Sequence, residues 1–223
     1  MTDLVALAEP RSSGAEAYQT LRTNLAFVLP GRAPRRILVT SPSVEEDKST
    51  PLANLAVVMA QAGQRVAVVD ADLRRPAQHR LFGLDNESGL STVLACADPS
   101  AALPMQGTTV PALEVMTSGP LPPNPAALLS SPGLGALVER LSGTHDVILF
   151  DAPPIVAVAD AAIVAPLVDG VLLVLAAGAS RRDHARRARE LLDKVGARVL
   201  GVVLTGVEPV SVGYGDASGG GAA

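Results

Sequence analysis

The sequence predicts an α/β fold, a doubly wound and mainly parallel sheet with helices on both faces. One observation is a set of five short runs that are rich in β-branched residues and almost continuously apolar, as strands buried on both faces are. A second is that helical patterns separate these runs. A third is a phosphate-loop pattern directly after the first run. The runs are Ile37–Thr40, Val66–Val69, Val147–Phe150, Val171–Leu175 and Val199–Leu204.

The first element along the chain is a helix over about 13–28, where apolar residues repeat at helical spacing. Because it precedes the first strand, we expect it to pack outside the core. The helix expected over Ser49–Ala62 carries its larger apolar residues on one stripe and ends at Gly63. The other expected elements are helices over Pro132–Leu141 and Arg181–Val195, a weaker strand over Leu113–Thr117 and a surface excursion over Cys96–Val110.

Composition sets the class of protein. The 223 residues suffice for one domain, expected over 1–210, with a flexible tail rich in Gly and Ser over 211–223. Hydrophobic residues make up 48% of the chain and aromatic residues only 2%, so the core has to be built from Ala, Val, Leu and Ile. A net charge of −4 gives a nucleic-acid partner no electrostatic support.

The cysteine content and the absence of a targeting segment in the sequence indicate where the protein is located. Cys96 is the single cysteine, which excludes an internal disulfide and fits a reducing cytosol. We expect it to be a small buried residue, and we expect the scattered histidines at the surface. The sequence shows no signal peptide and no apolar run of membrane-spanning length. A cytoplasmic protein is therefore predicted, with any membrane contact made through a partner.

Residues 48–50 read Lys-Ser-Thr and open a helix directly after a strand. This matches the end of the phosphate-loop pattern G-x-x-x-x-G-K-[ST], in which the lysine reaches β- and γ-phosphates and the next hydroxyl ligates Mg²⁺. The alternative is an ordinary helix start with a polar first turn. The loop before Lys48 contains no glycine, and Asp47 stands directly before Lys48, where the pattern has glycine.

Three aspartates strengthen the phosphate interpretation. Asp70 and Asp72 follow the second predicted strand, and Asp151 follows a later one. Ligands of open α/β sheets bind at the carboxyl ends of strands, and carboxylates there suit metal and water positioning in phosphoryl transfer. Turn or capping roles are the alternative for each single aspartate, but three at matched positions favour a site.

On these residues the chain resembles the bacterial tyrosine kinases, a branch of the P-loop ATPases related to the MinD/ParA group. Two matching segments are specific to that branch, and generic partition ATPases lack them: Asp-Leu-Arg-Arg-Pro at 72–76 and Pro-Pro-Asn-Pro at 122–125. The resemblance spans roughly 16–207. Further matches lie at 16–25, 79–83, 89–94, 151–154 and 168–171.

The resemblance implies Mg-ATP as cofactor and a role for each matching residue. Lys48 and Thr50 would hold phosphates, and Ser49 would ligate Mg²⁺. Asp70 would be the base that accepts the tyrosine proton, with Asp72 and Asp151 supporting the metal. It also implies control of capsular or extracellular polysaccharide export, a membrane chain-length regulator as activating partner, and a possible homo-oligomer.

The loop departs from the family pattern Pro-Gly-Glu-Gly-Lys-Ser-Thr. Glycine there permits a positive φ, and a non-glycine residue in such a conformation costs about 1–3 kcal/mol. A carboxylate ~4 Å from a phosphate oxygen adds a repulsion of ~1–4 kcal/mol. We therefore expect Glu45 and Asp47 to weaken ATP binding, with one of them pairing with Lys48. The alternative is that the loop takes another path.

Three further positions depart from the family. Thr205 stands where the last strand commonly ends in an asparagine that reads adenine. The helical interface motif Glu-x-x-Arg-x-x-Arg becomes Glu16-x-x-Gln19-x-x-Arg22, which removes one bidentate donor. Tyr214 is the only tyrosine of the tail and the one candidate there for phosphorylation.

Three functions remain open from the sequence. The first is a family member of polysaccharide export whose kinase activity is weakened or lost, a pseudokinase. The second is an active tyrosine kinase with Asp70 as base. The third is a MinD/ParA-type partition ATPase, which has less support because no lysine lies within 43–47, where that group places a second lysine.

Overall fold

The computed structural model describes residues 4–96, 98 and 101–207. Its seven-stranded sheet has the order β3-β4-β2-β5-β1-β6-β7, and β3 is antiparallel to its neighbour while the other pairs are parallel. This confirms the predicted fold class. The strands are β1 (Arg36–Thr40), β2 (Val66–Asp70), β3 (Gln106–Gly107), β4 (Leu113–Met116), β5 (Val147–Asp151), β6 (Gly170–Ala176) and β7 (Val199–Thr205).

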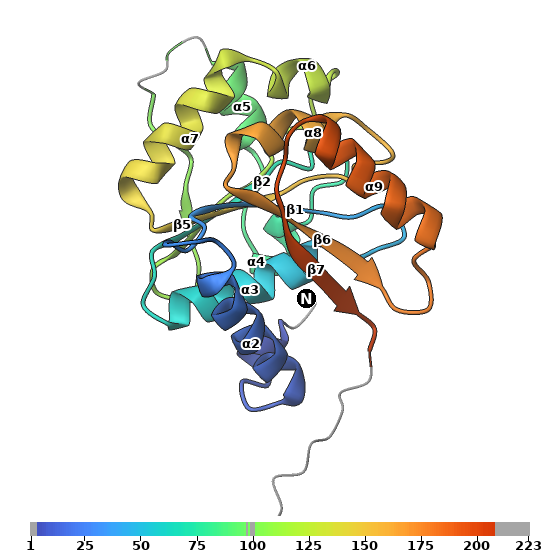
Figure 1. Cartoon of the computed structure of the whole chain (residues 1–223). Helices are drawn as coiled ribbons and strands as arrows, with labels where there is room; N and C mark the ends of the chain where they lie inside the picture. Colours follow the sequence, from blue (N-terminus) through green and yellow to red (C-terminus); the bar gives the residue numbers. More distant parts are fainter. Residues whose placement is uncertain (1–3, 97, 99–100, 208–223) are drawn as a thin grey trace, which may run out of the picture.

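Helices cover both faces of the sheet (Figure 1). The described helices are α1 (Val5–Ala8), α2 (Ser13–Phe27), α3 (Ser49–Gln61), α4 (Gln78–Phe82), α5 (Leu90–Ala95), α6 (Pro125–Leu129), α7 (Pro132–Thr144), α8 (Asp160–Val164) and α9 (Arg182–Lys194). None of them is long and apolar enough to cross a membrane. The expected tail 211–223, with Tyr214, lies outside the described residues.

Two apolar cores lie on opposite faces of the sheet. Alternate residues of β1 divide between them: Leu38 packs with α5, α7 and α9, whereas Ile37 and Val39 pack with α1, α2 and α3. The side chains are mostly Val, Leu, Ile and Ala, as the composition predicts. Strand residues that alternate between two buried faces explain why each run is apolar throughout.

Helix α3 is the most deeply buried helix of the site region. All of its residues except Thr50 and Gln61 are buried, because α1 and α2 cover the side that faces away from the sheet. The prediction of a single apolar stripe was therefore incomplete. Asn54 of α3 ties the first segment down, since its Oδ1 accepts the Ala6 N–H at 2.9 Å and its Nδ2 donates to the Thr50 carbonyl.

The other differences from the sequence predictions are local. Helices α1, α4, α5, α6 and α8 are four to six residues long, too short to show a helical period. The expected excursion at 96–110 contains β3. Two burial predictions were wrong. Cys96 is exposed, and His145 is buried, with its Nε2 lying 2.9 Å from Glu114.

Candidate active site at the carboxyl end of the sheet

The three predicted aspartates come together at one end of the sheet. Asp70 and Asp151 end the neighbouring strands β2 and β5 and are register partners. Asp72 lies two residues beyond β2, and its Oδ1 accepts the amides of Arg74 and Arg75. All three aspartates are at least 97% buried, so their charges act on one another with little screening.

Lys48 is the cation of this cluster. Its Nζ lies 2.9 Å from Asp72 Oδ2 and 3.2 Å from Asp151 Oδ1, and it lies 3.4 Å from Ser49 Oγ. Burial acts to lower the pKa of Lys48, but the charges of Asp151 and Asp72 and their hydrogen bonds outweigh it, so the pKa is raised. Lys48 therefore stays charged, and the expectation that it pairs with Glu45 or Asp47 was wrong.

Asp70 is held in a different way. Its Oδ2 accepts the backbone amides of Ala77 and Gln78 at 3.0 and 2.9 Å, and its Oδ1 accepts the amide of Asp72. Burial, followed by the charge of Asp151, raises the pKa of Asp70 to about 8, although the Gln78 amide acts in the opposite direction. A carboxyl group with such a pKa, fixed beside two other carboxylates, has the properties of a candidate acid or base.

Gln78 is a residue of the site that sequence reasoning missed. Its side chain is fully buried, and its Nε2 donates to Asp151 Oδ2 at 2.7 Å and to the Ser49 carbonyl at 3.2 Å. It thus links β5 to the start of α3. A glutamine eight residues after Asp70 gives no signal in the sequence, because only the return of the chain into α4 brings it back to the site.

The phosphate loop follows a path without left-handed residues. Among described non-glycine residues only Ala112 has a left-handed φ, of 63°. The expected strain at Glu45 and Asp47 is therefore absent, and the alternative path holds. Glu45 and Asp47 are exposed, and Asp47 Oδ1 accepts the Thr50 N–H at 3.1 Å. Asp47 thus behaves as a helix-start residue.

Glu46, not its two acidic neighbours, enters the loop. Its carboxylate is buried; Oε2 accepts the Ser43 N–H at 2.7 Å, and Oε1 accepts the hydroxyl of Ser180 from the segment after β6. Phosphate loops bind their ligand through backbone N–H groups. In this structure a side-chain carboxylate already uses one of those groups.

The donor set of Ser49, Asp72 and Asp151 fits Mg²⁺ in chemistry, because Mg²⁺ prefers oxygen ligands and completes its shell with water and phosphate oxygens. Within the described part of the chain, no three His, Cys, Asp or Glu side chains converge to hold a metal alone. Two buried oxygens of the site, Asp151 Oδ1 and Gln78 Oε1, have no hydrogen-bond partner among the described residues, although Asp151 Oδ1 lies 3.2 Å from Lys48 Nζ. The oxygen donors of the site therefore fit Mg²⁺, whereas the Ser43 amide of the loop is already bound to Glu46.

The remaining predicted residues lie apart from this cluster. Thr205 ends β7, and its hydroxyl donates to the Leu175 carbonyl at 3.3 Å. Glu16 is exposed on α2, and Arg22 Nε donates to Gln19 Oε1 at 3.3 Å. Gln19 replaces the arginine of the family motif, so here the two motif positions contact each other.

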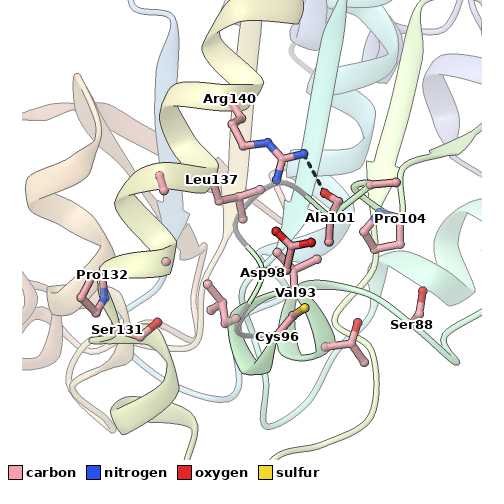
Figure 2. A pocket seen from close by; sticks show the side chains of 15 residues that line it. Ser88, Val93, Cys96, Asp98, Ala101, Pro104, Ser131, Pro132, Leu137 and Arg140 are labelled. Carbon is pink, nitrogen blue, oxygen red and sulfur yellow. Dashed lines mark hydrogen bonds between the residues drawn. The ribbon is translucent and has the colours of Figure 1, made fainter.

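A hollow of about 500 Å³ lies elsewhere, between α5, α7 and the segment that joins α5 to β3 (Figure 2). Arg140 of α7 crosses it and donates to the Ala101 carbonyl at 2.8 Å. Cys96 lies at its lining. None of the residues that line it belongs to the aspartate and lysine cluster.

Comparison with known proteins decides the family. A family model described as ParA, NUBPL iron-transfer P-loop NTPase, matches residues 35–206. The tyrosine-protein kinase YwqD of Bacillus subtilis is 41% identical over 92% of this chain and 86% of its own length. The kinase domain of Escherichia coli tyrosine kinase ETK superposes with a TM-score of 0.87 at 33% identity, covering 96% of this chain and 84% of that one. The chain belongs to the bacterial tyrosine kinase family.

The family resemblance predicted from the sequence is thereby confirmed. The tyrosine-protein kinase Wzc of Salmonella typhi is also similar, at 33% identity over 96% of this chain, and the match spans 30% of Wzc's length. These bacterial tyrosine kinases share the P-loop NTPase fold with the ParA group.

Proposed function

We propose that this chain acts in the synthesis and export of capsular or extracellular polysaccharide, as a bacterial tyrosine kinase whose ATP-dependent phosphorylation is weakened or lost. The observation that supports the proposal is the state of the phosphate loop. It has no glycine, because Glu45 and Asp47 replace the two glycines of the family pattern. Lys48 contacts Asp72 and Asp151, so a triphosphate would have to displace a carboxylate and draw the lysine from an ion pair.

The residues of the cluster have assignable roles in the family reaction. Mg-ATP, when bound, supplies the phosphoryl group and the metal that neutralises its charge. Lys48 and Thr50 would hold phosphates, and the metal would be supported by Ser49, Asp72 and Asp151. Thr205 would lie near the adenine ring of the nucleotide. Asp70 would accept the proton of the tyrosine hydroxyl, for which it has to be ionised. With a pKa of about 8, roughly a tenth of the molecules carry that form at pH 7.

The setting is proposed from the same family. We place the protein in the cytoplasm and expect a membrane chain-length regulator to activate it and bring it to the membrane. Glu16 and Arg22 would contribute to a homo-oligomer, and Tyr214 of the tail would be the phosphorylated residue. A nucleic-acid partner has no support from the net charge of −4.

One observation favours the second candidate, an active kinase. Lys48, Asp70, Asp72 and Asp151 are all present and converge within one buried cluster. The Mg²⁺ ligands and the candidate base are therefore retained even though the loop has changed. The only support for the third candidate, a partition ATPase, is the fold that it shares with this chain.

Incubation with Mg-ATP followed by detection of phosphotyrosine tests the proposal. We expect little or no label at Tyr214 in the wild-type chain, and no difference from Lys48→Met and Asp70→Asn variants whose folding is checked by circular dichroism. Strong labelling that both substitutions abolish would contradict the proposed loss and establish the active kinase.

A further inference from the structure

A groove lined by arginines begins where β2 leaves the aspartate cluster. It has a volume of about 570 Å³ and lies between the β2–α4 loop and the segment after β4. Arg74, Arg75 and Arg80 supply one wall, and Pro120 and Leu121 supply the other. Segment 72–76 supplies Arg74, Arg75 and Pro76 of this lining, and segment 122–125 begins directly after Leu121.

The turn after Asp72 carries two of the arginines, and both are exposed. Asp72 Oδ1 accepts the backbone amides of both Arg74 and Arg75, so one carboxylate fixes the turn on which the two arginines follow each other. Arg74 is neutralised, since its Nε and a terminal nitrogen bind the two oxygens of Asp160 at 2.8 and 3.0 Å. For Arg75 and Arg80, both exposed, the described residues supply no side-chain hydrogen bond or ion pair. Two positive charges therefore remain for a ligand.

The opposite wall is fixed in place. Asn86 Oδ1 accepts the Gly119 N–H at 2.9 Å and its Nδ2 donates to the Gly119 carbonyl at 3.1 Å. Gly119 has a φ of 72°, and a Cβ there would lie 2.7 Å from Ser91 Oγ and 2.9 Å from the backbone nitrogen of Gly89. The wall is thus held by backbone contacts that only glycine allows. Beyond it, Leu121 leaves 60% of its surface exposed, which offers an apolar contact next to the charges.

We propose that this groove binds an acidic polypeptide segment and so selects the tyrosine that reaches Asp70. The inference rests on the proposed function. Guanidinium groups bind carboxylates through paired N–H donors, and an apolar wall beside them suits a side chain of the same segment. One loop connects the groove to the candidate base: the Arg74 and Arg75 amides donate to Asp72, and the amides of Ala77 and Gln78 donate to Asp70. A segment in the groove would therefore lie against the loop that holds Asp70.

Direct binding of a peptide tests the assignment without nucleotide. The probe is a fluorescent peptide with one tyrosine between runs of glutamate, and its control is the same peptide with glutamine in place of glutamate. Anisotropy at low salt should show that the full chain binds the glutamate peptide at least about tenfold more tightly than the glutamine peptide. The Arg75→Glu, Arg80→Glu double variant should lose about tenfold in affinity for the glutamate peptide.

A matched control separates the groove from general charge. The Arg182→Glu, Arg186→Glu double variant makes the same change of charge on the exposed surface of α9, which joins β6 to β7 at the other edge of the sheet. Its affinity should stay within about twofold of wild type. An Arg75→Gln, Arg80→Gln variant should fall between the two, since it removes the attraction without adding repulsion.

Three results would overturn the groove assignment. They are equal binding by wild type and the double glutamate variant, equal binding of the two peptides, and an arginine dependence seen only with vesicles of anionic lipid. A chain that binds the acidic peptide through Arg75 and Arg80 but phosphorylates nothing would support the groove as the binding site. The absence of phosphorylation would then count against the kinase reaction and not against the groove.

Discussion

Lys48 and Asp72 form a buried ion pair that joins the phosphate loop to the chain leaving β2, with Nζ 2.9 Å from Oδ2. Asp151 completes the contact at 3.2 Å. A lysine that would hold phosphates is here part of the folded core. Its removal therefore affects stability as well as any reaction.

The first prediction concerns that stability. Lys48→Met should lower the free energy of unfolding by about 3–5 kcal/mol, because it leaves buried carboxylates without their cation. Urea unfolding followed by circular dichroism measures it. Lys194→Met, in the last turn of α9, serves as control and should change little. A loss below about 1 kcal/mol for Lys48→Met would show that the ion pair does not stabilise the fold.

The second prediction concerns pH. The pKa of Asp70 is raised to about 8 in the folded protein, above its ordinary value near 3.9. Between those values the folded state holds a proton that the unfolded state has lost, so its contribution to stability is complete at low pH and falls as pH rises towards 8. Asp70→Asn should remove this decline. Unfolding series from about pH 5 to pH 9 compare the two, and parallel curves would contradict the raised pKa.

The third prediction restores the family loop. Glu45→Gly with Asp47→Gly should raise the affinity for Mg-ATP by at least about tenfold, because two negative charges leave the loop and its backbone gains freedom. Isothermal titration calorimetry against wild type measures the change. Unaltered affinity would mean that these two residues do not limit binding.

The fourth prediction separates Glu46 from its neighbour. Glu46→Ala leaves the Ser43 amide and the Ser180 hydroxyl without their acceptor and should cost about 1–3 kcal/mol of stability, while raising affinity for Mg-ADP by removing the buried carboxylate from the loop. Glu45→Ala, at an exposed position, should cost less than about 0.5 kcal/mol. Equal losses in the free energy of unfolding for the two substitutions would show that the contacts of Glu46 do not stabilise the fold.

The fifth prediction tests the close approach that fixes one wall of the arginine groove. A Cβ on Gly89 would lie 2.1 Å from the Thr117 carbonyl oxygen, a backbone atom that cannot yield easily. Gly89→Ala should therefore destabilise the fold by at least about 3 kcal/mol. Gly135→Ala, within α7 where a Cβ meets no atom within 4 Å, should instead stabilise by ~0.5–1 kcal/mol. Thermal unfolding that ranks the two alike would contradict the steric account.

The sequence by itself determined six of the seven strands, all but the two-residue β3, and the meeting of Asp70, Asp72 and Asp151. Buried parallel strands are apolar throughout, and their carboxyl ends share one edge of the sheet. Short segments of the sequence therefore suffice to predict the strands and the place where the aspartates meet. The N-terminal helix was visible for the same reason, since a helix of fifteen residues, Ser13–Phe27, shows its period.

Only the tertiary structure decided which partners the charged groups take. The sequence placed acids beside Lys48, yet the lysine contacts Asp72 and Asp151, which lie far along the chain. It marked Glu45 and Asp47, yet Glu46 enters the loop, because the loop path determines which side chain points inward. Gln78 and the arginine groove likewise exist only once β2, β4 and α4 are packed. Contacts between residues distant in sequence depend on that packing, and no local pattern records it.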